Sequence, residues 1–156
     1  MLQRIQTFYL FLVFLFAVLF LAFPLGHFFI EGIAYPLKVS GITLPDPYQQ
    51  QVAMGLLRWV VLALFFAIMI LTVYSTFKYK KRLLQIKLGK LNILLHVALV
   101  VSAFFMIDQL KEQLHPATFS YGAAIFFPLA SMLFILLANR AIRKDEELVR
   151  SSQRIR

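Results

Sequence analysis

The sequence contains no cysteine among its 156 residues. Disulfide bonds, thiol chemistry and metal sites with thiolate ligands are therefore excluded. Charged residues are also scarce, at 15% of the chain, where an average soluble domain has ~25%. We find no G-x-S-x-G, H-E-x-x-H or Walker motif, so none of these nucleophile, zinc-protease or phosphate-binding signatures points to an enzyme.

Four long apolar runs occupy most of the chain, at residues 8–23, 59–74, 91–107 and 119–137. Each run approaches or reaches the ~20 residues that a helix needs to cross a ~30 Å hydrocarbon layer. Hydrophobic residues make up 61% of the sequence, more than a soluble domain of this size could bury, so lipid must face the excess. The sequence predicts an all-α fold, namely an integral-membrane four-helix transmembrane bundle built from two antiparallel helical hairpins.

We expect a single membrane domain over residues 1–156. Its predicted spans are residues 7–26, 55–77, 91–108 and 118–138. A basic loop at residues 78–90 joins the second and third spans, and a cytoplasmic helical tail covers residues 139–156. Asp46 and Pro47 are typical of the N-cap and first position of a helix, here the second one. Pro128 is expected to bend the fourth helix in mid-span.

The basic residues are distributed unevenly. Most of the 16 Lys and Arg residues fall in the 78–90 segment and in the C-terminal tail, whereas the other two connections carry only Lys38 and Lys111. The positive-inside rule therefore places both termini in the cytoplasm. The segment KYKKR has a topogenic role in the preferred interpretation and binds anionic lipid in the alternative one. The basic residues predicted to face lipid or a partner are Lys78, Lys80, Lys81, Arg82, Arg150 and Arg154.

Five polar residues fall near the outer ends of the spans: His27, Glu31, Arg58, Asp108 and His115. Imidazoles and carboxylates can bind Zn²⁺ or Mn²⁺, so the two histidines and two acids are candidate metal ligands. His27 and Glu31 would share a helix face if the first helix continued past Pro24. No spacing among them resembles a known metal motif. We therefore expect no metal or cofactor, and prefer an interfacial polar belt in which Arg58 snorkels and pairs with Asp108.

His96 is the one histidine inside a predicted span, near its cytoplasmic end. A haem with two axial histidines would need a partner at similar depth, and the other two histidines lie at the opposite face. The preferred interpretation of His96 is a hydrogen bond between helices, or a histidine near the interface, and a haem shared with another subunit is the alternative.

The two ends of the chain, MLQRIQTFYL and LANRAIRKDEELVRSSQRIR, resemble a family of short bacterial inner-membrane proteins, domain of unknown function 4293. The resemblance extends over the full length, and the closing segment is its more specific part. It implies a multi-pass protein of the bacterial inner (cytoplasmic) membrane with four spans. It assigns no activity and no residue roles.

Two functions are compatible with these observations. The leading hypothesis is a non-enzymatic accessory or scaffold subunit of a membrane protein complex, because no acidic residue lies at mid-membrane depth and a charged tail projects into the cytoplasm. Its partners would be anionic membrane lipids at the cytoplasmic face and another membrane protein, with no nucleic acid expected. The alternative is a protein that binds or transports a small ligand or metal through the outer polar cluster. An enzyme acting on lipid head groups is a distant third.

Overall fold

Four long helices dominate the computed structural model, which describes residues 2–52, 55–79, 81–114 and 117–154. They are α1 (Leu2–Ala22), α3 (Gly55–Phe77), α4 (Arg82–Gln113) and α5 (Phe126–Arg154). Helices α1, α3 and α4 are each long and apolar enough to cross a membrane, as is α5 together with the short 3-10 helix η1 (Ala123–Ile125) before it. Helix α3 covers the same residues as the second predicted span.

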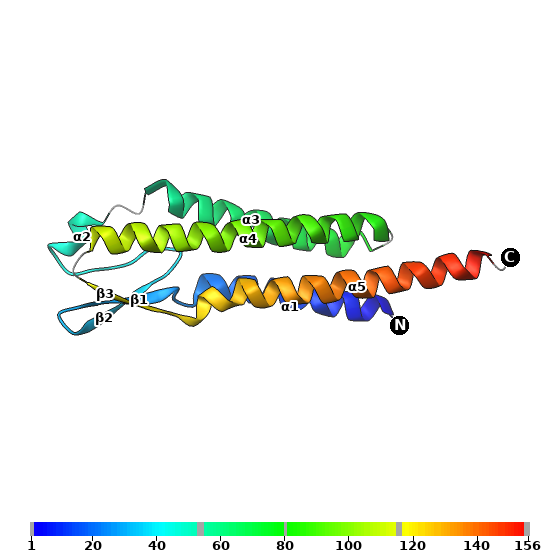
Figure 1. The fold of residues 1–156 in the computed structure, drawn as a ribbon, viewed down its shortest axis with the longest axis horizontal. Coiled ribbons are helices and arrows are strands. Elements are labelled where there is room, and N and C mark those ends of the chain that lie inside the picture. Colours follow the sequence, from blue (N-terminus) through cyan, green and yellow to red (C-terminus); the bar gives the residue numbers. More distant parts are fainter. Residues whose placement is uncertain (1, 53–54, 80, 115–116, 155–156) are drawn as a thin grey trace.

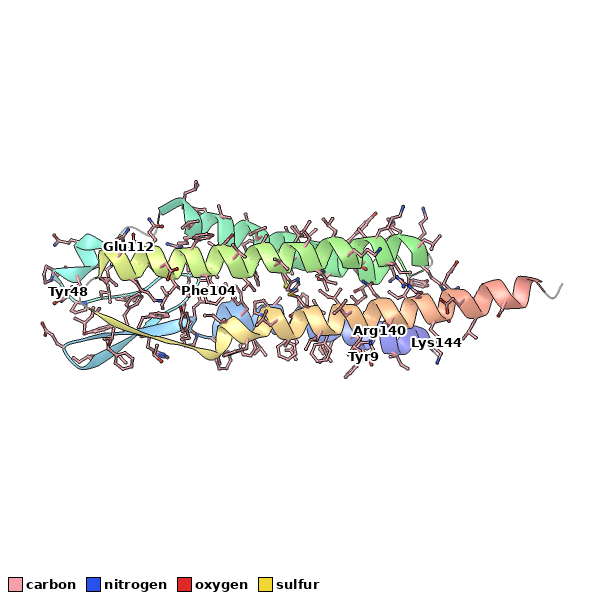
Figure 2. All side chains as sticks on the ribbon, in the orientation of Figure 1. Tyr9, Tyr48, Phe104, Glu112, Arg140 and Lys144 are labelled. Atoms are coloured by element: carbon pink, nitrogen blue, oxygen red, sulfur yellow. The ribbon has the colours of Figure 1, made fainter. Side chains whose placement is uncertain are left out.

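The outward faces of these helices are strongly apolar. Phe8, Phe66, Leu94 and Leu133 are each more than half exposed, whereas polar residues such as Asn92 are buried between the helices. Figure 2 shows side chains projecting outward along the whole length of the helices. Soluble proteins rarely expose contiguous apolar surface on this scale, so hydrocarbon is the solvent that this surface fits.

The helices pack most extensively in the pairs α1 with α5 and α3 with α4. Helix α4 also packs on α5, whereas α1 contacts α3 over a much smaller region. Aromatic rings fill the α1–α5 interface, where the ring centroid of Phe16 lies 5.5 Å from that of Phe134. Both chain ends and the α3–α4 connection lie at one end of the molecule, here called the termini end (Figure 1). The strands and the short α2 (Tyr48–Gln51) lie at the other, the sheet end.

A small antiparallel sheet corrects the all-α prediction. Its strands β1 (Gly26–Ile30), β2 (Ile33–Leu37) and β3 (Thr118–Tyr121) lie in the order β2-β1-β3. Phe28 of β1 is fully buried, with its ring centroid 4.7 Å from that of Phe119. Because Pro24 lacks a backbone donor, α1 ends at Ala22 instead of continuing to residue 26. Strand pairing then satisfies the backbone groups of the connections.

The third helix starts at Arg82 rather than near Leu91, so the predicted basic loop at residues 78–90 is mostly the first turns of α4. Hydropathy marks only the part of a helix that lies in lipid, whereas the hydrogen-bonded helix continues into water wherever no residue stops it. The helix continues past Asp108, the last residue of the predicted span, and ends at Gln113. The start of the helix was therefore predicted too late, whereas the apolar stripe of Ile107, Leu110 and Leu114 already indicated a helical extension past Asp108.

Three predicted helix signals act differently in the structure. Asp46 and Pro47 precede the short α2 and not α3, which begins separately at Gly55. Residues 118–121, expected at the start of the fourth span, form β3 instead. Pro128 lies in the first turn of α5, where the missing N–H group needs no partner. The predicted mid-span bend is therefore wrong.

Candidate functional site

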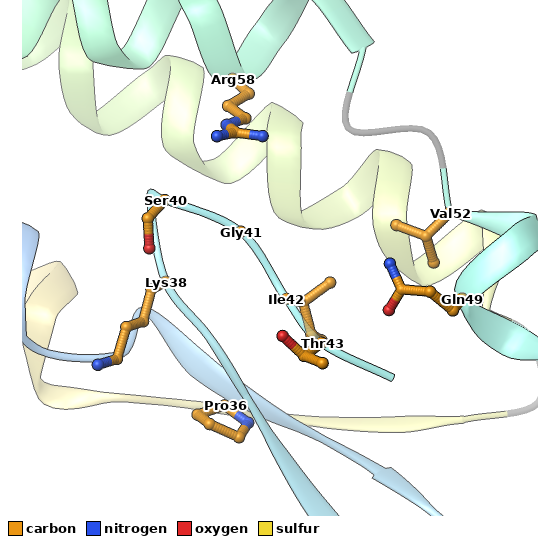
Figure 3. Close-up of a pocket in the computed structure, with 9 residues that line it drawn as sticks. All are labelled: Pro36, Lys38, Ser40, Gly41, Ile42, Thr43, Gln49, Val52 and Arg58. Carbon is orange, nitrogen blue, oxygen red and sulfur yellow. The ribbon is translucent and has the colours of Figure 1, made fainter. Parts of the chain in front are cut away.

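An open pocket of about 630 Å³ lies at the sheet end, between the segment that follows β2 and the first turns of α3 (Figure 3). Two cations, Lys38 and Arg58, line it together with the neutral polar side chains of Ser40, Thr43 and Gln49. Pro36, Gly41, Ile42 and Val52 complete the lining. No carboxylate is among the described residues that line the pocket, so its electrostatic character is positive.

A tight turn shapes the floor of the pocket. The backbone N–H of Lys38 donates to the carbonyl of Gly41 at 3.0 Å, and the N–H of Gly41 donates back at 3.1 Å. Gly41 has a φ of 148°, which side-chain-bearing residues rarely adopt. Val39 and Ile42 are buried and anchor the turn in the core. The exposed side chains of Lys38 and Ser40 are therefore carried on a fixed backbone.

Gln49 of α2 holds the opposite wall. Its Oε1 accepts a hydrogen bond of 2.7 Å from the backbone N–H of Leu44. Figure 3 shows the amide group of Gln49 turned toward the segment that carries Ile42 and Thr43. Because Oε1 is occupied by the backbone, Nε2 is the atom that Gln49 can offer to a ligand as a donor.

Arg58 occupies the first turn of α3 and extends toward the turn that carries Ser40 (Figure 3). Its Nε atom is buried without a hydrogen-bond partner in the described part of the chain. The guanidinium carbon lies 5.5 Å from the ring centroid of Trp59, an additional cation–π contact. A buried donor without an acceptor is costly, and the positive end of the α3 dipole lies in the same turn. An anion in the pocket would accept a hydrogen bond from Nε of Arg58 and would interact favourably with the positive end of the helix dipole.

The predicted outer cluster does not converge. His27 lies in β1 opposite Pro36 and Ser120. Glu31 occupies the turn after β1, so the helix face that it was expected to share with His27 does not exist. The carboxylate of Asp108 lies 3.3 Å from Nζ of Lys111, and the predicted pairing with Arg58 is wrong.

The candidate metal centre has no counterpart in the described residues. Among them, no group of three or more His, Cys, Asp or Glu side chains is placed to hold a metal ion. His115 lies outside the described residues. Of the four predicted polar residues that the structure describes, Arg58 is the one that lines the pocket, and its described neighbours there favour an anion over a cation.

A sequence model of one family, described as "Domain of unknown function (DUF4293)", matches residues 2–155. The chain belongs to this family. The match confirms, over nearly the full length of the chain, the resemblance that the sequence indicated. A comparison with curated proteins found no match. Membership of DUF4293 carries no assigned activity, so residue roles depend on the geometry.

At the termini end of this DUF4293 protein, the predicted basic residues have different surroundings. The Nε atom of Arg82 lies 2.9 Å from Oδ2 of Asp145 on α5, so Arg82 joins two helices. Nζ of Lys78 lies 5.2 Å from the ring centroid of Tyr74, and Lys81 is exposed. Lys80 lies outside the described residues. Arg150 and Arg154 belong to α5, with side chains outside the described set.

The sequence reasoning missed a line of buried polar side chains between α3 and α4. Nε2 of Gln85 donates to the carbonyl of Ser75 at 2.8 Å, and Nδ2 of Asn92 donates to Oγ1 of Thr72 at 2.8 Å. His96 continues this line but uses Nδ1 within its own helix, at 2.8 Å from the carbonyl of Asn92. The predicted interhelical bond of His96 is therefore replaced by an intrahelical one. The intervals of seven and four residues between Gln85, Asn92 and His96, which place them on one face of α4, were a signal that could have revealed the line.

Proposed function

We propose that this DUF4293 protein is a membrane-embedded binding protein that takes a small anionic group into the pocket at its sheet end. The proposal includes a four-helix transmembrane bundle of two antiparallel hairpins, with both termini in the cytoplasm. Two features support that orientation: both termini share one end (Figure 1), and Arg140 and Lys144 lie toward it (Figure 2). The pocket would then open on the outer face of the inner membrane.

The observation that carries the proposal is that Lys38 and Arg58 both line one pocket, with no carboxylate among its described lining. Guanidinium and ammonium groups form short, charge-assisted hydrogen bonds with phosphate and carboxylate oxygens. The hydroxyls of Ser40 and Thr43 can donate to further oxygens of the same ligand. A phosphate or carboxylate group therefore matches the site better than a metal ion does.

The proposed role is binding without chemical turnover. Ser40 is a hydroxyl in the pocket, but the lining residues that the structure describes offer no histidine or carboxylate to remove its proton. The charge pattern suits electrostatic recognition alone, and the open shape suits exchange of ligand with the outer solvent.

Equilibrium binding of inorganic phosphate to the purified protein in mild detergent tests this function. We expect saturable binding that Arg58→Gln weakens by about tenfold or more, because hydrogen bonds to charged groups contribute ~1.5–3 kcal/mol. Lys111→Gln is the matched control, since Lys111 lies outside the pocket lining and is paired with Asp108. Phosphatidylglycerol in micelles, tested in parallel, separates a lipid head group from free phosphate. Equal binding by all three proteins would contradict the proposal.

A second candidate function is that of an accessory or scaffold subunit of a membrane complex. It is favoured by α5, whose C-terminal turns extend beyond the other helices at the termini end (Figure 1). The Arg82–Asp145 ion pair fixes the base of this extension against α4. A partner membrane protein would dock on the extension. Affinity purification in mild detergent at native expression tests this function, and a stoichiometric membrane partner is the expected result; recovery of the chain alone would contradict it.

A further inference from the structure

A continuous apolar groove lies between α1 and α3. Two hollows of about 300 Å³ and 380 Å³ share Phe14, Val73 and Phe77, so we treat them as one feature, the α1–α3 groove. It exists because α1 packs mainly on α5 and α3 mainly on α4, which leaves the α1–α3 contact small. The remaining lining residues are Thr7, Leu10, Phe11, Met69, Ile70, Thr72, Tyr74 and Thr76.

The α3 hydroxyls in this groove are turned away from it. Oγ1 of Thr72 donates to the carbonyl of Ile68 at 2.8 Å, and Oγ1 of Thr76 donates to the carbonyl of Thr72 at 2.9 Å. The hydroxyl proton of each threonine is therefore donated to the backbone of α3, and Oγ1 of Thr72 also accepts from Asn92 on α4. Because the rest of the wall is mainly aliphatic and aromatic, hydrocarbon is the chemistry that fits the groove.

Positive charge marks the termini end of the groove. Lys78 follows Phe77 directly, and its Nζ lies 5.2 Å from the ring centroid of Tyr74, which lines the groove. Lys81 is exposed in the same connection, and the 78–90 segment contains no acidic residue. A ligand with an apolar body and an anionic head group would match both the apolar walls of the groove and the basic residues at its termini end.

We propose that the α1–α3 groove binds an acyl chain of an anionic phospholipid, whose phosphate lies against Lys78 and Lys81. The groove extends from Met69 to Phe77, about 12 Å at 1.5 Å per helical residue, which suits part of one extended acyl chain. Transmembrane helices pack against small residues, whereas bulky Phe11, Phe14 and Phe77 form these walls. The site rests on the membrane placement and orientation proposed above, but not on ligand binding at the sheet end.

Native mass spectrometry of the purified protein, titrated with phosphatidylglycerol or phosphatidylcholine, tests the head-group contact. We expect preferential retention of phosphatidylglycerol, reduced about fivefold for each charge removed in Lys78→Ala and Lys81→Ala. Lys87→Ala and Lys90→Ala are the matched controls, because both are exposed lysines on the first turns of α4. Equal retention by the two pairs of variants would overturn the assignment of the head group.

A groove-filling variant tests the acyl contact. Val73 is 40% exposed, so Val73→Trp can place its ring in the groove and should lower retention of both lipids severalfold. Val101→Trp is the control, since Val101 is 48% exposed on α4 and does not line the groove. Unchanged lipid retention in Val73→Trp would overturn the proposal. The proposal would also be overturned if the wild-type protein were a dimer without bound lipid and Val73→Trp converted it to a monomer. A second copy of the chain would then occupy the groove.

Discussion

Asn92 on α4 donates a hydrogen bond from Nδ2 to Oγ1 of Thr72 on α3 at 2.8 Å, and both side chains are almost fully buried. Between two apolar helices in lipid there is little hydrophobic driving force for association, so polar contacts and close packing must fix how the helices meet. The same pair of helices is joined again by Gln85 and the carbonyl of Ser75. These contacts set the register of α3 against α4.

Thr72→Val should lower the free energy of unfolding by about 1 kcal/mol, because the variant keeps the shape of the side chain but leaves the Asn92 amide without its acceptor. Thr72→Ser retains the hydroxyl and should be closer to wild type. Thermal unfolding in mild detergent measures the difference. Equal stability of the two variants would show that the bond does not hold the helices together.

Gly89→Ala should loosen the contact of α4 with α5. A Cβ at this position would collide with the side-chain amide of Asn139 on α5. We expect the single variant to lose about 1–3 kcal/mol through overpacking. The double variant with Asn139→Ala should recover most of that loss, and a double-mutant cycle of unfolding measurements isolates the coupling. If the two substitutions changed the free energy of unfolding additively, a side chain at position 89 would not clash with Asn139.

The absence of cysteine from the sequence makes the topology directly testable. Ser151→Cys and Glu31→Cys introduce single thiols at exposed positions near the two ends of the molecule. A membrane-impermeant maleimide applied to intact cells should label Glu31→Cys and spare Ser151→Cys until the membrane is permeabilised. The reverse pattern would invert the proposed orientation.

Phe28→Ala should release the sheet from the ends of the helices. Phe28 is fully buried against Phe119, and removing a buried aromatic side chain costs about 3–5 kcal/mol. Phe29→Ala is the control, because Phe29 is 40% exposed on the opposite face of the same strand. Limited proteolysis should cut the β1–β2 region faster in Phe28→Ala alone. Equal cutting of both variants would mean that Phe28 does not anchor the sheet.

Hydropathy alone located all four long helices, because an apolar run of this length has few other stable conformations. The ends of α3 were located as well, but the end of α1 and the start of α4 were not. Arg82 begins α4 well before its apolar run, since a helix needs no lipid once its backbone bonds are formed. Phe28 belongs to β1 because of its partners Tyr35 and Phe119, which are distant contacts that a local pattern does not contain.

The residues of the candidate site could likewise be predicted only as far as local sequence patterns allow. Arg58 was recognised as an interfacial cation, but its relation to Lys38 depends on how the segment after β2 folds back over α3. Asp108 was expected to pair with Arg58, yet it forms its ion pair with Lys111, one helical turn away on α4. Contacts within one helix could be deduced from spacing, whereas contacts across the fold required the structure.

The most direct test of the outward-facing anion pocket uses Ser40→Cys, a single thiol in the pocket lining. The rate of its modification by an impermeant maleimide would be measured in intact cells with and without added phosphate. We predict labelling from outside that phosphate slows, and loss of this protection when Arg58→Gln is added. Labelling only after permeabilisation, or a rate that phosphate leaves unchanged, would contradict the account.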